Sequence, residues 1–258
     1  MKDRDDTAAS PARIRDAWKR LGPCFGNLRP DQVDRLRCRT YRRDRRKEGA
    51  GDGTIRTELQ YLRAGLRFND KHTPAIVELA PKPPPKDVTI TLAQHAELVK
   101  GALHNHMKLY IELAGATAGR PQAILQLKWA QIDFERQIIR LGDGTRRVKG
   151  RATVPIKDRL LAMLKEAKEG ALSDFVIEWA GGQVKSIKKG FASAAANADM
   201  AHVTPYVLRH SAAVWMAEDG VPMSEIAQFL GHEDSQITER VYARYSPEYL
   251  RRAARALP

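Results

Sequence analysis

Apolar residues over positions 1–80 recur three or four apart, which predicts a small all-helical domain. One helix is expected to begin at Pro11, directly after the capping residue Ser10. A second is expected to open at Pro30 and continue to Lys47, and a third to be capped by Thr54. The apolar stripes that support these helices are Ile14, Trp18 and Leu21; Val33 and Leu36; and Ile55, Leu59, Leu62 and Leu66.

The sequence PKPPPK at 81–86 interrupts this helical pattern. Consecutive prolines fix φ and remove backbone donors, so the run is expected to be an extended, stiff linker. It divides the chain into a helical domain over 1–80, a linker over 81–87 and a larger domain over 88–258.

The larger domain has a mixed pattern. Helical spacing recurs in three segments, 91–102, 107–114 and 121–128. The period then changes, and glycine turns separate three short expected strands, 138–141, 146–148 and 152–156. Helices are expected again from Asp158 to the end. The predicted fold class is mainly α with a small three-stranded β-sheet: a helical domain followed by an α+β domain.

The charge of the chain is strongly unbalanced, with 44 Lys and Arg against 31 Asp and Glu and a formal net charge of +13. This excess predicts a polyanionic partner, DNA or RNA. The basic run from Arg35 to Lys47 is expected to present a face that follows phosphates. An apolar fraction of 43% suffices for a packed core and argues against wholesale disorder.

Two cysteines, Cys24 and Cys38, stand in no CxxC pair and have no histidine at ligand spacing. Neither a disulfide framework nor a zinc site is therefore expected, and both thiols should be reduced and partly buried. No apolar run reaches the length of a membrane span, and MKDRDDTAAS lacks the apolar stretch of a signal peptide. We expect an intracellular protein.

Two arginines lie at expected helix starts. Arg120 directly precedes Pro121, and Arg209 lies in the first turn of a helix expected to begin at Pro205. Free N–H groups and the helix dipole favour an anion there, and two planar guanidinium groups could hold one phosphodiester. Taken singly, each arginine is typical of an ordinary surface residue.

Three further residues could act beside such a phosphate. Lys149 lies in the expected turn between the second and third strands. His232 follows Gly231, which ends a short helix expected to be capped by Ser224, and Tyr242 comes ten residues after His232. A phenol has an ordinary pKa of about 10, so a tyrosine nucleophile needs a neutralised phosphate and a group that takes its proton. His232 could orient a phosphate oxygen or assist proton transfer, and Lys149 could protonate a leaving 5′-oxygen. No cluster of carboxylates suggests a metal, and no cofactor is expected.

The order of these patterns resembles the tyrosine recombinases of the phage integrase family. ATAGRPQAILQLKWAQID resembles the first arginine box of the family, TPYVLRHSAA the second, and FLGHEDSQITERVY its histidine and nucleophile box. Residues 88–250 resemble the catalytic domain, and 11–75, notably GTIRTELQYLRAGL, resemble the helical core-binding domain. The ordered combination is far more specific than any single box.

The resemblance implies a site-specific recombinase that cuts and rejoins double-stranded DNA through a 3′-phosphotyrosyl bond, without ATP. Matched by motif, Arg120 and Arg209 would clamp the phosphate, Lys149 would be the general acid, His232 the third-box histidine and Tyr242 the nucleophile. The resemblance also implies a dimer on each crossover site and a tetrameric synapse. A directionality factor is a further candidate partner, and the expected place of action is the cytoplasm, at the nucleoid of a bacterial or phage system.

Two residues depart from the family pattern. Tyr206 stands where the second box usually begins with His, and Ala123 stands where an acidic residue often follows the first arginine. A tyrosine can donate a hydrogen bond to a phosphate oxygen, but it is a poor base at neutral pH. Tyr245 is the alternative nucleophile to Tyr242.

Other interpretations stay open. Residues 223–242 could form a helix-turn-helix, so a DNA-binding regulator or a degenerate recombinase without catalysis is an alternative. A type IB topoisomerase would share the chemistry without exchanging strands. The stretch 246–257 is expected to be a capped helix that packs either on its own domain or on a neighbouring protomer.

Overall fold

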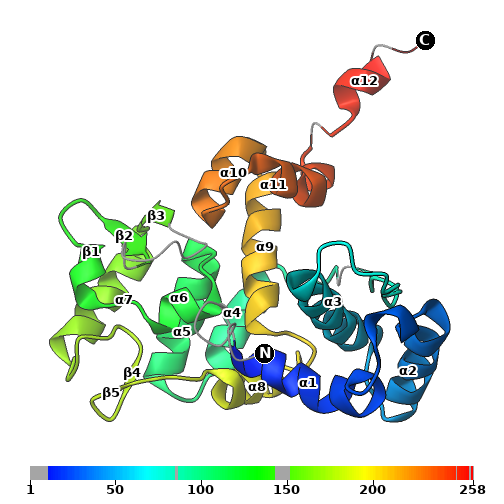
Figure 1. The fold of residues 1–258 in the computed structure, drawn as a ribbon. Coiled ribbons are helices and arrows are strands. Elements are labelled where there is room, and N and C mark those ends of the chain that lie inside the picture. Colours follow the sequence, from blue (N-terminus) through cyan, green and yellow to red (C-terminus); the bar gives the residue numbers. More distant parts are fainter. Residues whose placement is uncertain (1–10, 85–86, 143–151, 248, 256, 258) are drawn as a thin grey trace. The chain divides into compact units, whose positions relative to one another are not determined.

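The computed structural model describes residues 11–84, 87–142, 152–247, 249–255 and 257. The chain divides into two compact units, Met1–Lys86 and Asp87–Pro258, which are described separately (Figure 1). The predicted fold class is confirmed, because the chain is mostly helical and carries a small three-stranded sheet.

The described part of the first unit contains α1 (Pro11–Phe25), the 3₁₀ turn η2 (Pro30–Gln32), α2 (Arg35–Lys47) and α3 (Asp52–Asn69). The second predicted helix is therefore divided. Asp34 starts α2 by accepting a hydrogen bond from the Arg37 amide at 2.8 Å, which leaves Val33 outside the helix. Gly51, not the predicted Thr54, occupies the N-cap position of α3.

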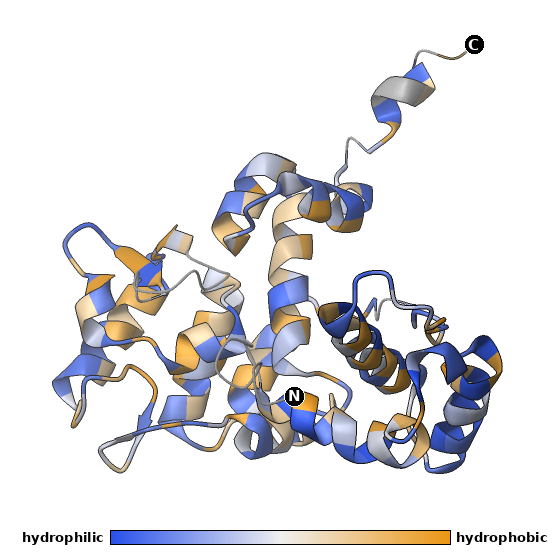
Figure 2. Ribbon diagram, in the orientation of Figure 1, coloured by the Kyte–Doolittle hydropathy of each residue, from blue (hydrophilic) through white to orange (hydrophobic). Residues whose placement is uncertain are grey.

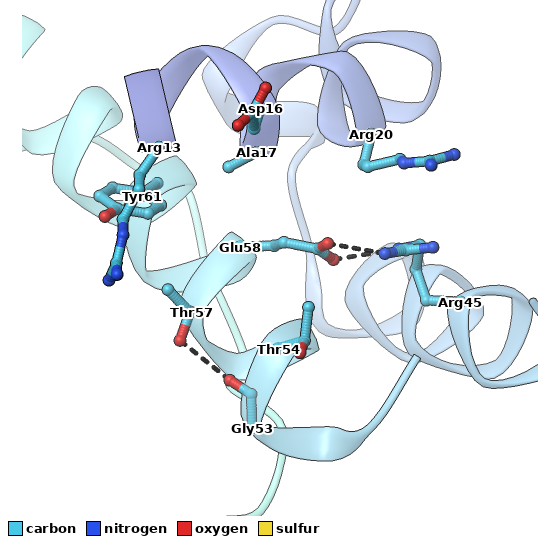
Figure 3. Close-up of a pocket in the computed structure, with 10 residues that line it drawn as sticks. All are labelled: Arg13, Asp16, Ala17, Arg20, Arg45, Gly53, Thr54, Thr57, Glu58 and Tyr61. Atoms are coloured by element: carbon cyan, nitrogen blue, oxygen red, sulfur yellow. Dashed lines mark hydrogen bonds and ion pairs between the residues drawn. The ribbon is translucent and has the colours of Figure 1, made fainter. Parts of the chain in front are cut away.

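A buried polar network joins α2 to α3 inside the first unit. Glu58 accepts a hydrogen bond from Tyr41 Oη at 2.7 Å and two from Arg45, at 2.8 and 3.1 Å. Figure 3 shows Glu58 and Arg45 pointing toward each other along one side of a groove, and α1 borders the groove with Arg13 and Arg20. Burial and the hydrogen bond to Glu58 raise the pKa of Tyr41 well above its usual range, so the phenol stays protonated.

The basic helix α2 is largely hydrophilic in Figure 2. Most of its arginines form ion pairs with carboxylates of the same unit. Apart from the buried pair of Arg45 with Glu58, these ion pairs lie nearer the surface and contribute little each to stability. Together the pairs leave fewer free cations for a polyanion than the charge pattern predicted. The pairs are Arg39 and Arg42 with Glu78, Arg43 with Asp44, Arg45 with Glu48 and Glu58, and Arg46 with Asp52.

The second unit begins with helices and returns to helices after its strands. Before the three-stranded sheet lie α4 (Leu92–Gly101), α5 (Asn105–Thr117), α6 (Pro121–Leu125) and the 3₁₀ turn η3 (Trp129–Gln131). Directly after the sheet follows α7 (Asp158–Glu169). The later elements are α8 (Lys188–Asn197), α9 (Pro205–Glu218), α10 (Met223–Leu230), α11 (Ser235–Tyr242), the 3₁₀ turn η4 (Ala243–Tyr245) and α12 (Arg251–Arg255).

The three-stranded sheet is antiparallel in the order β1 (Ile132–Asp133), β2 (Ile138–Leu141) and β3 (Ala152–Pro155). Its register pairs Ile139 with both Ile132 and Val154, so one buried face is apolar. The strand β1 was not predicted, because two residues are too short for a detectable period. The predicted strand at 146–148 lies outside the described residues.

Four other expectations about local structure were wrong. The helix from Pro121 ends at Leu125, before the predicted 128. The segment after Asp158, in which only helices were predicted, also contains a hairpin of β4 (Glu178–Trp179) with β5 (Gly182–Gln183). Pro222, not Ser224, occupies the N-cap position of α10. The predicted C-terminal helix is short in the described residues, and its packing partner stays a prediction.

Both cysteines are free, but Cys24 is exposed rather than partly buried, whereas Cys38 is buried. No helix among the described residues is long and apolar enough to cross a membrane.

Helix α9 organises the second unit (Figure 1). It packs against α5, α10 and α11, and small buried residues such as Ala212, Ala213 and Ala217 permit this close approach. Its side chains also hold the start of the unit: Ser211 Oγ accepts from Ile90 N at 2.9 Å, and Trp215 Nε1 donates to Ile90 O at 2.8 Å. The chain near residue 90 is thereby fixed on α9.

We predict that Glu58→Ala destabilises the first unit by about 3 kcal/mol, because it leaves the Arg45 guanidinium largely buried without its main partner. Asp44→Ala, which removes an exposed pair with Arg43, should cost less than about 1 kcal/mol. Denaturant titration read by hydrogen exchange in α2 and α3 measures both. Equal losses in the two variants would show that the buried network is not what stabilises the unit.

Candidate active site

Arg120 lies where α5 turns into α6. Ala118 ends α5 in the left-handed region (φ 47°, ψ 25°), and Thr117 Oγ1 accepts a hydrogen bond from Gly119 N at 3.2 Å. A Cβ atom at position 119 would lie 3.0 Å from Thr117 Oγ1, so the turn favours glycine. Pro121 then occupies the first position of α6, which leaves Arg120 at the N-cap position.

Arg209 lies in the first turns of α9 and joins three elements. Its Nη1 donates to Ala118 O at 2.6 Å, and its Nη2 donates to Leu230 O at 2.9 Å. Burial, reinforced by the charge of Arg120, lowers the pKa of Arg209 to about 10, which still leaves the guanidinium charged at neutral pH. The two arginines predicted to clamp one phosphate are therefore close enough to interact.

His232 is held between Arg209 and α11. Gly231 ends α10 in the left-handed region (φ 63°), and the backbone N–H of His232 closes the turn by donating to Ala227 O at 2.9 Å. Its Nε2 lies 3.2 Å from Arg209 Nη2, and its Nδ1 lies 2.8 Å from Thr238 Oγ1. Because a guanidinium can only donate, Nε2 accepts and Nδ1 carries the proton. Burial and the nearby charges of Arg209 and Arg120 lower the pKa of His232, so this neutral tautomer prevails at pH 7.

Tyr242 is the last residue of α11 and is only 8% exposed. It packs in an apolar cluster that includes Ala213 and Leu230. Burial raises the pKa of Tyr242 above its usual value, although the charge of Arg209 acts in the opposite direction. The phenol is therefore protonated at neutral pH. Its hydroxyl lies 3.3 Å from His210 Nδ1, and the two rings are 5.3 Å apart.

Two residues beside the tyrosine were missed by the sequence reasoning. His210 Nε2 lies 3.3 Å from Asp87 Oδ1, and Asp87 also accepts from Tyr245 Oη at 2.5 Å and from Arg244 Nη2 at 2.7 Å. The second arginine box contained His210, but no pattern related it to Asp87, which lies more than a hundred positions earlier and at the edge of the expected linker. These contacts hold the carboxylate in its charged form, and the pKa of Asp87 is lowered chiefly by the Tyr245 hydrogen bond.

The remaining predicted site residues are placed less completely. Tyr206 lies in the first turn of α9 with a side chain that is 66% exposed, and it interacts electrostatically with Arg209. Ala123 lies within α6 and brings no charge. Lys149 lies outside the described residues. Arg120 Nη1 is buried and has no hydrogen-bond partner in the described part of the chain.

The ends of α6, α9, α10 and α11 thus bring together two guanidinium groups, a neutral imidazole and a protonated phenol. Such a set can bind a phosphodiester and offer it a tyrosine oxygen. In the described residues, no group of three or more His, Cys, Asp or Glu side chains could hold a metal ion.

A mostly helical fold thus carries paired arginines near a tyrosine at a helix end. The profile of the phage integrase family matches residues 86–248, and the chain belongs to that family. The predicted family and the predicted class of activity, a site-specific DNA recombinase, are confirmed.

Individual proteins resemble this chain in sequence or in fold. The chain is 28% identical over 222 residues to tyrosine recombinase XerA of Thermococcus onnurineus, covering 81% of this chain and 76% of that protein. It spans about half the length of several other curated relatives. The fold matches the Tn1549 transposon integrase in complex with circular intermediate DNA, with a TM-score of 0.77, 17% identity and coverage of 99% and 96%. It also matches a lambda integrase dimer bound to a COC′ core site, with a TM-score of 0.71, 13% identity and coverage of 90% and 71%.

We predict that Thr238→Val lowers the rate of DNA strand cleavage about tenfold, because it leaves the Nδ1–H of His232 without an acceptor in a buried place. Affinity for DNA should change little, since Thr238 is fully buried. Single-turnover cleavage at saturating protein, with a separate binding titration, measures the two effects.

Thr238→Ser is the matched control, because it keeps the hydroxyl and should retain most of the rate. A serine variant as slow as the valine variant would indicate a packing role for the threonine methyl group instead.

Proposed function

We propose that this chain cuts DNA at specific sites by attack of Tyr242 Oη on one backbone phosphorus, and rejoins the strands by the reverse step. The observation that carries the proposal is the convergence of Arg120, Arg209 and His232 near this tyrosine. Tyr242 is preferred over Tyr245 as the nucleophile because the nearby charge of Arg209 favours the ionised form of Tyr242. The hydroxyl of Tyr245 is instead hydrogen-bonded to Asp87, and burial together with this bond raises its pKa.

In this proposal the two arginines bind the scissile phosphate and stabilise the extra negative charge of the pentacoordinate transition state. Arg209 is already oriented by two backbone carbonyls, and the buried Nη1 of Arg120 has a donor to offer. His232 keeps Arg209 in place and can reach a phosphate oxygen only by exchanging that contact. Tyr206 could donate a hydrogen bond from the rim of the site, and Lys149 would protonate the leaving 5′-oxygen.

The proposed partner is double-stranded DNA bearing a recombination site, with two protomers on each crossover site and four in the synapse. The lambda integrase dimer on its core site, which shares this fold, supports such an assembly. The first unit would bind beside the crossover point as a core-binding domain. A directionality factor, and action in the cytoplasm at the nucleoid, belong to the same proposal.

We predict that a suicide DNA substrate carrying the recombination site traps a covalent complex with the wild-type chain. Tyr242→Phe should abolish the complex, because it removes only the attacking oxygen, whereas Tyr245→Phe should retain most of it. Denaturing gel electrophoresis detects the adduct, and peptide mapping identifies the residue. Loss of the adduct in the Tyr245 variant alone would assign the nucleophile to that residue, and specific binding without any adduct would favour the regulator interpretation.

We predict that Arg120→Ala slows adduct formation by at least about a hundredfold but weakens DNA binding far less, because its contribution grows as charge develops on the phosphate. Single-turnover rates and binding isotherms at one fixed salt concentration separate these effects. Parallel losses in rate and affinity would mean that Arg120 only binds DNA.

A further inference from the structure

We propose that His210 is the general base that takes the proton from Tyr242, and that Asp87 positions it. This inference rests on the proposed function, since it assumes that Tyr242 is the nucleophile. The three side chains form a continuous path, with 3.3 Å from Tyr242 Oη to His210 Nδ1 and 3.3 Å from His210 Nε2 to Asp87 Oδ1. A nucleophile, a base and a group that orients the base are the parts of an activated hydroxyl.

The tautomer required for this role follows from the partners. A charged carboxylate only accepts hydrogen bonds, so His210 Nε2 carries the proton that points to Asp87. The other nitrogen, Nδ1, then has a free lone pair, and it faces the hydroxyl of Tyr242. The imidazole is thus arranged to accept a proton from the phenol and from no other group in the described contacts.

A base is needed here, because burial raises the pKa of Tyr242 and keeps the phenol protonated. His232, the histidine expected from the sequence, is a poor candidate. Its Nε2 accepts from Arg209 and its Nδ1 donates to Thr238, so both ring nitrogens are occupied. In the described part of the chain, no contact joins His232 to the tyrosine hydroxyl.

Asp87 is held firmly enough to orient the ring. Three residues later, the backbone of Ile90 is fixed on α9 by Ser211 and Trp215. The carboxylate itself accepts from Arg244 and Tyr245, which follow the nucleophile on η4. Asp87 therefore links the start of the second unit, the base on α9 and the turn that carries the nucleophile.

The proposed step is balanced in atoms and charge. The O–H bond of Tyr242 breaks, its proton goes to His210 Nδ1, and the phenolic oxygen forms a bond to phosphorus. The bond from phosphorus to the 5′-oxygen breaks, and that oxygen takes a proton from a separate acid. The resulting imidazolium lies beside the Asp87 carboxylate, which stabilises it. In rejoining, the leaving phenolate takes the same proton back.

The first test compares His210→Asn with the wild-type full-length chain in single-turnover cleavage of the suicide substrate. Asparagine can keep a hydrogen bond to Asp87 or Tyr242, but it cannot take a proton. We expect adduct formation to slow by at least about a hundredfold, with DNA affinity unchanged. A rate close to that of the wild type would overturn the proposal.

A second substrate distinguishes base from acid. When sulfur replaces the bridging 5′-oxygen, the leaving thiolate needs no proton, so only the need for a base remains. We expect His210→Asn to stay slow on this substrate, relative to the wild type. Restoration to the wild-type rate would place His210 on the leaving-group side and overturn its assignment as the base.

Chemical rescue tests the role even if the side chain also matters for packing. In His210→Ala, added imidazole should raise the cleavage rate in proportion to its neutral form, and the same imidazole should not accelerate the wild-type chain. A slow His210→Ala variant that imidazole does not accelerate at any concentration would favour a structural role and overturn the proposal. Absence of any adduct with the wild-type chain would instead overturn the proposed function, and this inference with it.

Discussion

The burial of one guanidinium group, that of Arg209, is the constraint on which the catalytic unit depends. A charged group that is removed from water is stable only if hydrogen bonds replace its hydration. Arg209 donates such bonds to the carbonyl oxygens of Ala118 and Leu230. Those two oxygens belong to the ends of α5 and α10, which lie far apart in sequence. The same side chain that would bind the phosphate therefore also assembles the turn before Arg120 and the turn before His232. Lysine, with a single ammonium group, could not span both carbonyls in the same geometry.

The site divides into two halves with different electrostatic tasks. Arg120, Arg209 and His232 form a positive half in which burial and like charge lower the pKa values of the histidine and Arg209. Asp87, His210 and Tyr245 form a half in which a carboxylate is held charged. Tyr242 lies between them. Groups with such different environments can carry out proton removal and charge stabilisation on one phosphodiester without neutralising each other.

The sequence was sufficient for the fold class and for the order of the chemical groups, because both depend on local patterns. Helix starts at Pro121 and Pro205, and the helix end at Gly231, follow from backbone preferences that act within a few residues. The contacts of Asp87 with His210 could not be predicted, since they join residues 123 positions apart through tertiary packing. The ion pairs of the α2 arginines could not be predicted for the same reason, because Glu78 and Glu58 come close to these arginines only after the unit folds. The roles of the site residues, including Lys149, stay predictions.

The geometry of α11 also limits how related sequences can vary in length. Thr238 and Tyr242 lie four residues apart and share one buried face of this helix. One inserted residue between them would rotate the tyrosine by about 100° around the helix axis and carry its hydroxyl away from the phosphate site. The same limit extends to the start of the helix, because Asp234 caps it by accepting a hydrogen bond from Gln236 N at 2.8 Å. Alignments that place a gap inside 235–242 are therefore physically suspect.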